Sequence, residues 1–474
     1  MNLQHRSKKS NQKKSIPSQS QFSSVAQRTL TNLKRVINKK TIDEFARESK
    51  LIQRVSSKII GFDFLGAMLI ASLDAEHGTL ERICDIIYTI NHQIKITSQS
   101  LMERLNSEAA PHFFEMVFKN ILKVQFDDFI SAVPPDLLIS FTKILLQDSS
   151  SIDLNAKLSA FFKGSGGRAS EASLKIDVIY DFKAKQFEQI KLTDHSEADQ
   201  KLGLDILNFL EPNTLVIRDL GYLRMDCIIK IDTMRAFFLS RFKNNTCVYL
   251  NKEDMDQLDL AEHLYKNHKN KNVVELDVYI TNNKVPVRLI AYRVPDEVSA
   301  ERKRKAHATA KKQGRTITKK NLNLLAFSIF ITNVPKETWP AEIVGTIYRI
   351  RWQIELLFKS WKSGLKIDYL KGISHHRIRA LIFVRMILVI VINEMYKMLD
   401  YIGNCIGKVV SMHKVYNWIK CTERMKAILK CQLNWWEERY LADMIVMCMS
   451  KQTRNKKTSL QAIHEGDYYY QEAS

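Results

Sequence analysis

The chain has 474 residues and 45% hydrophobic content, enough to bury the cores of roughly two to four domains. Lys and Arg outnumber Asp and Glu by 72 to 51, and the resulting net charge of +21 favours a polyanionic partner, most simply nucleic acid. The sequence argues against a membrane protein, because its most apolar run (381–392) is short and carries Arg385. It also argues against a signal peptide and against a disulfide or zinc framework, so a reducing cytoplasm is expected.

The first quarter of the chain is expected to be helical. Residues 1–25 are polar and basic and should form a disordered tail, and 26–125 should form a helical DNA-binding domain. Thr41 is the expected N-cap of one helix, and 61–75 should form a mostly apolar one. The segments 81–90 and 95–105 would form a pair of short helices, which fits either a helix-turn-helix DNA reader or ordinary packing.

Residues 135–240 have the element order of an α/β domain. An apolar strand, Thr142 to Gln147, should deliver Asp148 at its end, and 173–182 and 186–193 should pair as antiparallel strands. A helix should run from Ser196 to Leu210, and the apolar strand 214–218 should deliver Asp219.

Residues 241–323 differ from this pattern and predict a β-rich insertion. Short β-like segments occur at 246–250, 273–280 and 285–293, followed by a basic helical run at 302–312. Nine Lys or Arg stand against one acid between Glu301 and Lys320, which indicates contact with DNA phosphates or a solvated face. A strand at 323–332 should resume the core, whose second part spans 324–400, and 401–474 should form a helical C-terminal region.

The stretch around Glu355 is the most informative part of the chain. It is expected to form one helix, on which Tyr348, Arg351, Glu355 and Lys362 fall within about 60° of each other, while apolar residues occupy the other side. A carboxylate among two cations and a phenol suits a metal ligand beside phosphates. The alternative is a solvated helix face with an Arg–Glu pair four residues apart.

Asp148 and Asp219 at strand ends and Glu355 on the helix could converge, because neighbouring strands of a sheet lie about 5 Å apart. Three converging carboxylates repel one another unless cations neutralise them, and oxygen ligands favour Mg²⁺ or Mn²⁺, with two ions suited to phosphodiester chemistry. Asp153, Asp177 and Asp181 remain alternatives to Asp148.

Here the chain resembles the bacterial DDE transposases of the family named after insertion sequence four. That family's signature is Tyr, two residues, Arg, three residues, Glu, six residues, Lys, and this sequence has all four residues at that spacing. The segments 217–222 and 146–150 resemble the two Asp blocks, and the resemblance covers about residues 40–400. It implies an RNase H-like α/β catalytic core interrupted by the β-rich insertion, with helical N-terminal and C-terminal regions.

The resemblance implies a role for each matching residue. Asp148, Asp219 and Glu355 would be the catalytic residues and hold the metal ions, two Mg²⁺ for which Mn²⁺ can substitute. On the signature helix, DNA phosphates would be contacted by Tyr348, Arg351, Lys359 and Lys362, and Trp352 would stack on a flipped-out base. Where some relatives have a second Trp that fills the place of this base, the chain has Phe327. Two departures occur, Leu220 after the second Asp and Ser149 after the first.

The implied function is cut-and-paste DNA transposition by metal-dependent cleavage and strand transfer at inverted-repeat ends, through a DNA hairpin. Partners would be the double-stranded DNA of the element ends and of the target, and a second copy in a dimeric synaptic complex, with no membrane. The rival hypotheses are a related metal-dependent nuclease, a catalytically inactive DNA-binding protein derived from a transposase, and a membrane-surface protein. The intact trio of acids argues against the inactive protein.

Overall fold

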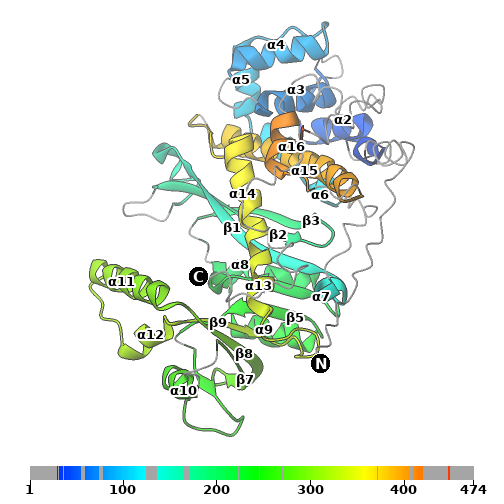
Figure 1. The fold of residues 1–474 in the computed structure, drawn as a ribbon. Coiled ribbons are helices and arrows are strands. Elements are labelled where there is room, and N and C mark those ends of the chain that lie inside the picture. Colours follow the sequence, from blue (N-terminus) through cyan, green and yellow to red (C-terminus); the bar gives the residue numbers. More distant parts are fainter. Residues whose placement is uncertain are drawn as a thin grey trace. The chain divides into compact units, whose positions relative to one another are not determined.

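The structure is a computed structural model, shown as a ribbon in Figure 1. It describes residues 29–448 apart from gaps at 30, 36, 55–58, 74–77, 124–135, 165–169, 196, 198, 223, 245, 268–271, 371, 406–408 and 420–446. The expected tail at 1–25 and most of the C-terminal region after 419 lie outside the described residues. The chain divides into two compact units: a helical unit (1–132, 363–366 and 379–452) and a sheet unit (133–362, 367–378 and 453–474). The domain boundaries expected from the sequence stay predictions.

The helical unit packs around aromatic side chains. Its helices are α2 (Lys39–Glu48), α3 (Gly61–Leu73), α4 (Leu80–Ile90), α5 (Ser98–Asn106), α6 (Ala109–Lys123), most of α15 (His375–Cys405) and α16 (Met412–Ile419). Phe64 of α3 lies 5.7 Å from Phe114 of α6, between ring centroids, and both rings are buried. The helix pair α4–α5 is confirmed, and its role as a DNA reader stays a prediction.

Helix α2 begins earlier than expected. Its N-cap is Asn38, whose Oδ1 accepts hydrogen bonds from the backbone N–H groups of Lys40 (2.9 Å) and Thr41 (3.3 Å). Thr41 was therefore wrong as the N-cap. Asn is as good a capping residue, and it stands one turn earlier.

The sheet unit contains one nine-stranded sheet in the order β3-β2-β1-β4-β5-β9-β8-β7-β6. The strands are β1 (Ile144–Leu154), β2 (Ala172–Asp181), β3 (Gln186–Asp194), β4 (Leu215–Arg218), β5 (Phe237–Arg241), β6 (Val248–Tyr249), β7 (Val273–Ile280), β8 (Val285–Arg293) and β9 (Phe327–Thr332). The first three pair antiparallel, and β4 and β5 continue parallel to β1. This is the strand arrangement of an RNase H-like core, so the predicted fold class is confirmed.

The insertion does not form a sheet of its own. β9 pairs with β5 on one side and with β8 on the other, both antiparallel, so β8, β7 and β6 extend the sheet that β1 to β5 begin. The insertion also carries helices α10 (Leu260–Asn267), α11 (Asp296–Lys312) and α12 (Lys319–Leu324). The expected strand at 323–332 was wrong in its first residues, because α12 occupies Asn323 and Leu324 before β9 begins.

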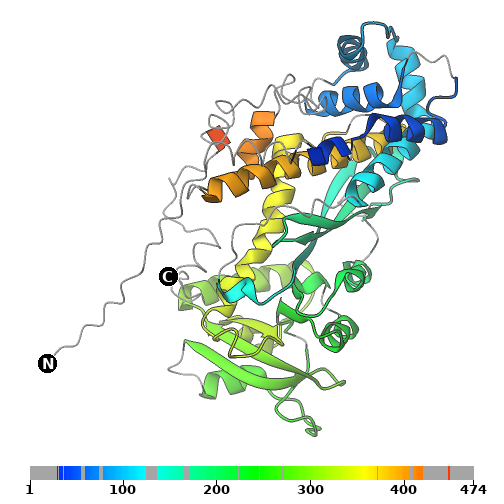
Figure 2. The ribbon, with the colours of Figure 1, turned by 90° about the vertical axis from the view of Figure 1, so that its right-hand side faces the viewer.

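Helices cover both faces of the sheet near β4. Figure 1 shows α13 (Val344–Tyr348) and α14 (Trp352–Leu365) crossing in front of the strands, and Figure 2 shows these yellow helices to one side of the sheet. A 3₁₀ turn, η4 (Arg349–Arg351), joins them, so the expected single helix is continuous but tightened at its centre. On the other face, α9 (Met225–Thr233) packs Ile228 and Ile231 into the core that includes Val216.

One expected helix is broken. Instead of one helix from Ser196 to Leu210, the chain forms the short α8 (Asp199–Leu202) and the 3₁₀ helix η2 (Asp205–Phe209). Gly203 stands at the break, where its carbonyl accepts a hydrogen bond from Arg218 (2.7 Å). A Cβ at this position would lie 3.1 Å from the carbonyl oxygen of Tyr222, so the close packing of the two backbone segments depends on the absence of a side chain at Gly203.

No helix in the ranges given above is both long and apolar enough to cross a membrane.

Candidate active site

Strand register places two aspartates side by side. The parallel pairing of β1 with β4 ends where Gln147 lies opposite Arg218. Asp148 is the next residue of β1, and Asp219 directly follows the end of β4. Since paired strands lie about 4.8 Å apart, both carboxylates stand at the same edge of this pairing. Asp148 does not end its strand as expected, because β1 continues to Leu154 by pairing with β2 on its other side.

The third acid, Glu355, stands on α14, and side chains of the preceding residues link it to the two aspartates. Arg351 donates a hydrogen bond from Nη2 to Oε1 of Glu355, and its Nη1 lies 3.6 Å from Oδ2 of Asp148. Tyr348 donates from its phenol to Oδ1 of Asp219, at 3.4 Å. The buried side chains of Tyr348 and Arg351 therefore connect all three predicted acids.

The site has an unusual electrostatic environment. The pKa of Asp148 is raised to about 6, mainly by burial. The Ser149 N–H group and Arg351 lower this pKa, whereas the nearby Glu355 and Asp219 raise it. Burial also raises the pKa of Tyr348. Perturbed acids of this kind gather at functional sites more often than elsewhere.

The three acids have the chemistry of a hard-cation site. Their donor atoms are all oxygens, which suits Mg²⁺ or Mn²⁺ rather than zinc. In the part of the chain that the structure describes, however, no three His, Cys, Asp or Glu side chains are grouped closely enough to hold a metal ion. Arg351 lies between two of the acids and supplies positive charge there.

The other predicted site residues occupy different environments. Trp352 is 60% exposed and lies one turn before Glu355, and Lys359 is exposed on the same helix. Lys362 donates to the carbonyl of Ser151 at 2.9 Å, which ties α14 to β1. Phe327 is only 6% exposed and belongs to the hydrophobic core, where its ring packs edge-on against the partly exposed Tyr265, so the structure does not bring it to the acids.

The alternatives to Asp148 lie elsewhere. Asp153 is exposed further along β1, and Asp181 accepts three backbone N–H bonds at and beside the β2–β3 turn. Asp177 is fully buried and bonded to Tyr222 and Gln147. The sequence analysis did not predict these contacts. The only indication of them in the sequence is that Gln147 and Asp177 are polar residues within otherwise apolar strands.

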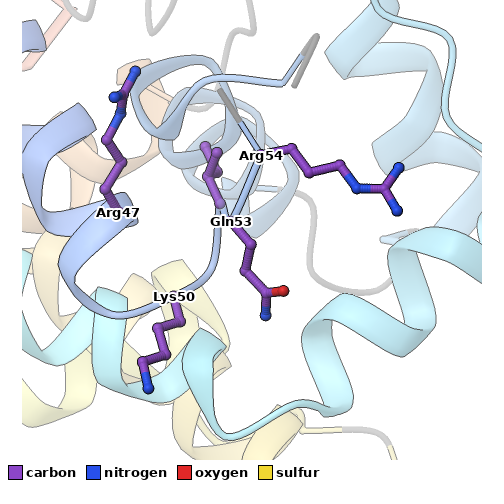
Figure 3. Close-up of a pocket in the computed structure, with 5 residues that line it drawn as sticks. Arg47, Lys50, Gln53 and Arg54 are labelled. Atoms are coloured by element: carbon purple, nitrogen blue, oxygen red, sulfur yellow. The ribbon is translucent and has the colours of Figure 1, made fainter. Parts of the chain in front are cut away.

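A second feature stands in the helical unit. A depression of about 290 Å³ follows the end of α2 and is lined by Arg47, Lys50, Ile52, Gln53 and Arg54. Figure 3 shows that the charged ends of its basic side chains point away from one another. They do not converge on a single anion, and the depression contains none of the predicted acids.

Three comparisons relate the chain to known proteins. Residues 139–392 match the family described as "Transposase DDE domain". The transposase for insertion sequence element IS231E of Bacillus thuringiensis subsp. finitimus is 29% identical over 374 residues, 75% of this chain and 77% of that protein. The transposase for IS1151 of Clostridium perfringens is 27% identical over 365 residues, 73% of this chain and 76% of its own length.

Among solved structures, the piggyBac transposase in a synaptic complex with hairpin DNA covers 90% of this chain and 87% of its own, with 11% identity and a TM-score of 0.44. A likeness at that level assigns no role to any residue here.

Proposed function

The chain belongs to the transposase DDE domain family, and from this we propose that it performs cut-and-paste transposition at the inverted-repeat ends of an insertion sequence. The resemblance carried by Tyr348, Arg351, Glu355 and Lys362 is confirmed at the level of the family, and the protein is a DNA transposase enzyme. The steps, the residue roles and the partners described below are proposals.

One observation supports the assignment of the acids most directly. Asp148, Asp219 and Glu355 come from a strand, a strand end and a helix far apart in the sequence, yet Arg351 and Tyr348 contact all three. We therefore assign these three carboxylates as the catalytic residues and as the ligands of Mg²⁺ or Mn²⁺. When bound, divalent ions would activate the attacking oxygen and stabilise the leaving oxygen of the phosphodiester.

The proposed reaction cuts the two strands at an element end one after the other, through a hairpin. In the first step, water attacks the phosphodiester at the element end and frees a 3′-hydroxyl. That hydroxyl then attacks the opposite strand and displaces a second 3′-oxygen, which leaves a hairpin on the element end. Water then attacks the phosphodiester that closes the hairpin and frees the 3′-hydroxyl again. This hydroxyl attacks a phosphodiester of the target DNA and displaces a 3′-oxygen there.

Trp352 fits the hairpin step. A hairpin strains the terminal bases out of their stack, and base–aromatic stacking is worth about 1–3 kcal/mol. The 60% exposed indole stands one turn from Glu355, within reach of a base at the cleavage point. Arg351, Lys359 and Lys362 would contact phosphates on the same side, with Tyr348 at the phosphate nearest Asp219.

The expected partners are double-stranded DNA and a second copy of the chain, because transposition brings two element ends together. Binding of the backbone would be salt-dependent, as the net charge of +21 indicates. The basic face of α11 is a candidate for part of this contact, with Lys303, Arg304, Lys311 and Lys312 on it.

The test uses purified protein with Mg²⁺ and DNA that carries the inverted repeats flanking its own gene. Three proteins are compared: the wild type, a Glu355→Gln variant, and a matched control, Glu337→Gln, at an exposed acid before α13. We expect end cleavage and a hairpin product from the wild type and the control, and specific binding without cleavage from Glu355→Gln.

The other outcomes separate the rival functions. Cleavage with no joining to target DNA would indicate a nuclease. Specific binding without cleavage by any of the three proteins would indicate an inactive DNA-binding protein. Cleavage by Glu355→Gln at the wild-type rate would refute the assignment of this carboxylate.

A further inference from the structure

A chain of buried polar side chains lies on the other face of the sheet from the active-site acids. Asp177 of β2 accepts hydrogen bonds on both carboxylate oxygens, from the Tyr222 phenol at 2.8 Å and from Nε2 of Gln147 at 3.2 Å. Asp177 and Gln147 are fully buried and Tyr222 is 2% exposed. Polar groups buried this deeply cost free energy unless every one is paired, so the geometry of this cluster is tightly specified.

The cluster extends to the strand that delivers the second aspartate. Oε1 of Gln147 accepts from Nη1 of Arg218 at 3.3 Å, and the same nitrogen donates to the carbonyl of Gly203 at 2.7 Å. Nη2 of Arg218 donates to Sγ of Cys227 at 3.1 Å, on α9. Hydrogen bonds thus join β1, β2, β4 and α9 beneath the acids.

Two members of the cluster are next to a proposed catalytic residue along the chain. Gln147 directly precedes Asp148, and Arg218 directly precedes Asp219. Because side chains alternate between the faces of a strand, fixing Gln147 and Arg218 on one face fixes where the following carboxylates emerge on the other. Tyr222 closes the turn after Asp219, where its N–H donates to the Asp219 carbonyl at 3.2 Å, and its phenol then ties that turn to β2.

We propose that Asp177, Tyr222 and Gln147 form a brace that positions Asp148 and Asp219 for binding of the divalent cation. The three are positioning residues, since they act through the aspartates and touch neither cation nor DNA. This inference rests on the proposed role of Asp148 and Asp219 as metal ligands. Groups that orient metal ligands from behind typically change metal affinity or activity by about 10–100-fold when they are removed.

A purely structural role for the cluster would have a different signature. Loss of one buried hydrogen bond would then lower the stability of the fold without a particular effect on the cation. The comparison therefore needs a second buried tyrosine that makes a similar bond elsewhere. Tyr249 is 5% exposed and donates to Oδ1 of Asn282 at 3.2 Å, within the β-rich insertion.

The experiment compares Tyr222→Phe with Tyr249→Phe in the full-length protein. Mn²⁺ binding is followed by electron paramagnetic resonance titration, which does not depend on cleavage. Thermal unfolding, affinity for the inverted-repeat DNA and the Mg²⁺ concentration for half-maximal cleavage are measured in parallel. We expect both variants to unfold at similarly reduced temperatures and to bind DNA like the wild type, while Mn²⁺ and Mg²⁺ affinities fall roughly 10-fold in Tyr222→Phe alone.

A second variant keeps the test decisive if Tyr222→Phe is poorly folded. Asp177→Asn preserves the size of the side chain but leaves one acceptor oxygen, where the carboxylate accepts on one oxygen from Tyr222 and on the other from Gln147. It should therefore weaken Mn²⁺ binding as well. The double variant should lose less than the sum of the two single losses, since both substitutions act on the same hydrogen-bonded cluster. Equal Mn²⁺ affinity in Tyr222→Phe, Asp177→Asn and the wild type would overturn the brace. A wild-type protein that neither cleaves nor binds Mn²⁺ would instead overturn the proposed function.

Discussion

Replacing Arg351 by Gln should destabilise the protein when no divalent cation is present. Arg351 bonds to Glu355 and lies 3.6 Å from Asp148, so it neutralises two of the three acids. Without it, Asp148, Asp219 and Glu355 would repel one another in a partly buried setting. A bound cation can supply the missing positive charge, and the variant should therefore depend on Mg²⁺ more than the wild type does.

The size of the effect follows from exposure. The side chains of Arg351, Asp148 and Glu355 are 11%, 22% and 42% exposed. Breaking an exposed pair costs about 0.2–1 kcal/mol and breaking a fully buried one about 3–5 kcal/mol. These pairs lie between the two limits, and Glu355 is well screened, so we expect a loss of about 2 kcal/mol. At about 2–4 °C per kcal/mol, the unfolding temperature should fall by about 4–8 °C.

Thermal unfolding with and without millimolar Mg²⁺ measures both effects. Arg241→Gln is the matched control, because Arg241 also lies over the Tyr348 ring, at 5.7 Å from its centroid, but forms no ion pair with the three acids in the part of the chain that the structure describes. We expect Mg²⁺ to raise the unfolding temperature of Arg351→Gln more than that of the wild type or the control. If Arg351→Gln unfolds at the wild-type temperature without cation, or gains no more from Mg²⁺, the reasoning about charge neutralisation is refuted.

Three further substitutions test separate parts of the structure. Burial raises the pKa of Glu394, on α15, to about 7, so the folded state binds a proton more tightly than the unfolded state does. The free energy of unfolding should therefore fall by up to about 3 kcal/mol as the pH rises from about 4.5 through 7. Urea unfolding of Glu394→Gln should show a flatter pH profile, and an unchanged slope would contradict this. In Gly61→Ala, the new Cβ would lie 2.6 Å from Cβ of Ala46, so urea unfolding should show a loss of about 1–3 kcal/mol, whereas wild-type stability would mean that α2 and α3 are packed less closely. Lys362→Met removes the bond to the Ser151 carbonyl and should cost about 1 kcal/mol, measured in the same way; no change would show that this contact does not anchor α14.

The parts of the active site that were predictable from the sequence are those carried by local pattern. The apolar run before Asp219 forms β4 as expected, and the spacing of Arg351 and Glu355 gives their ion pair one turn apart. The strand before Asp148 was also found, but its length depends on pairing with β2, and pairing partners are not visible in a single strand.

Features that depend on distant partners could not be predicted. The break at Gly203 follows from the Arg218 guanidinium that bonds to its carbonyl, fifteen residues away along the chain. The contacts of Asp177 require β1, β2 and the turn at Tyr222 to lie together, and the spacing of these residues along the chain does not predict that. Phe327 was expected to contact DNA because of its aromatic ring, yet β9 places that ring in the hydrophobic core.

The central position of β9 limits how freely this protein can be shortened or recombined. The segment 241–323 is an insertion in sequence, but in space its strand β8 shields one edge of β9, whose other edge pairs with β5. Excision of the segment would leave β9 with a bare apolar edge, a template for aggregation. Chimeras that exchange this region between relatives should therefore carry β9 along with it, and engineers seeking a minimal transposase should expect soluble protein only when that edge is covered again.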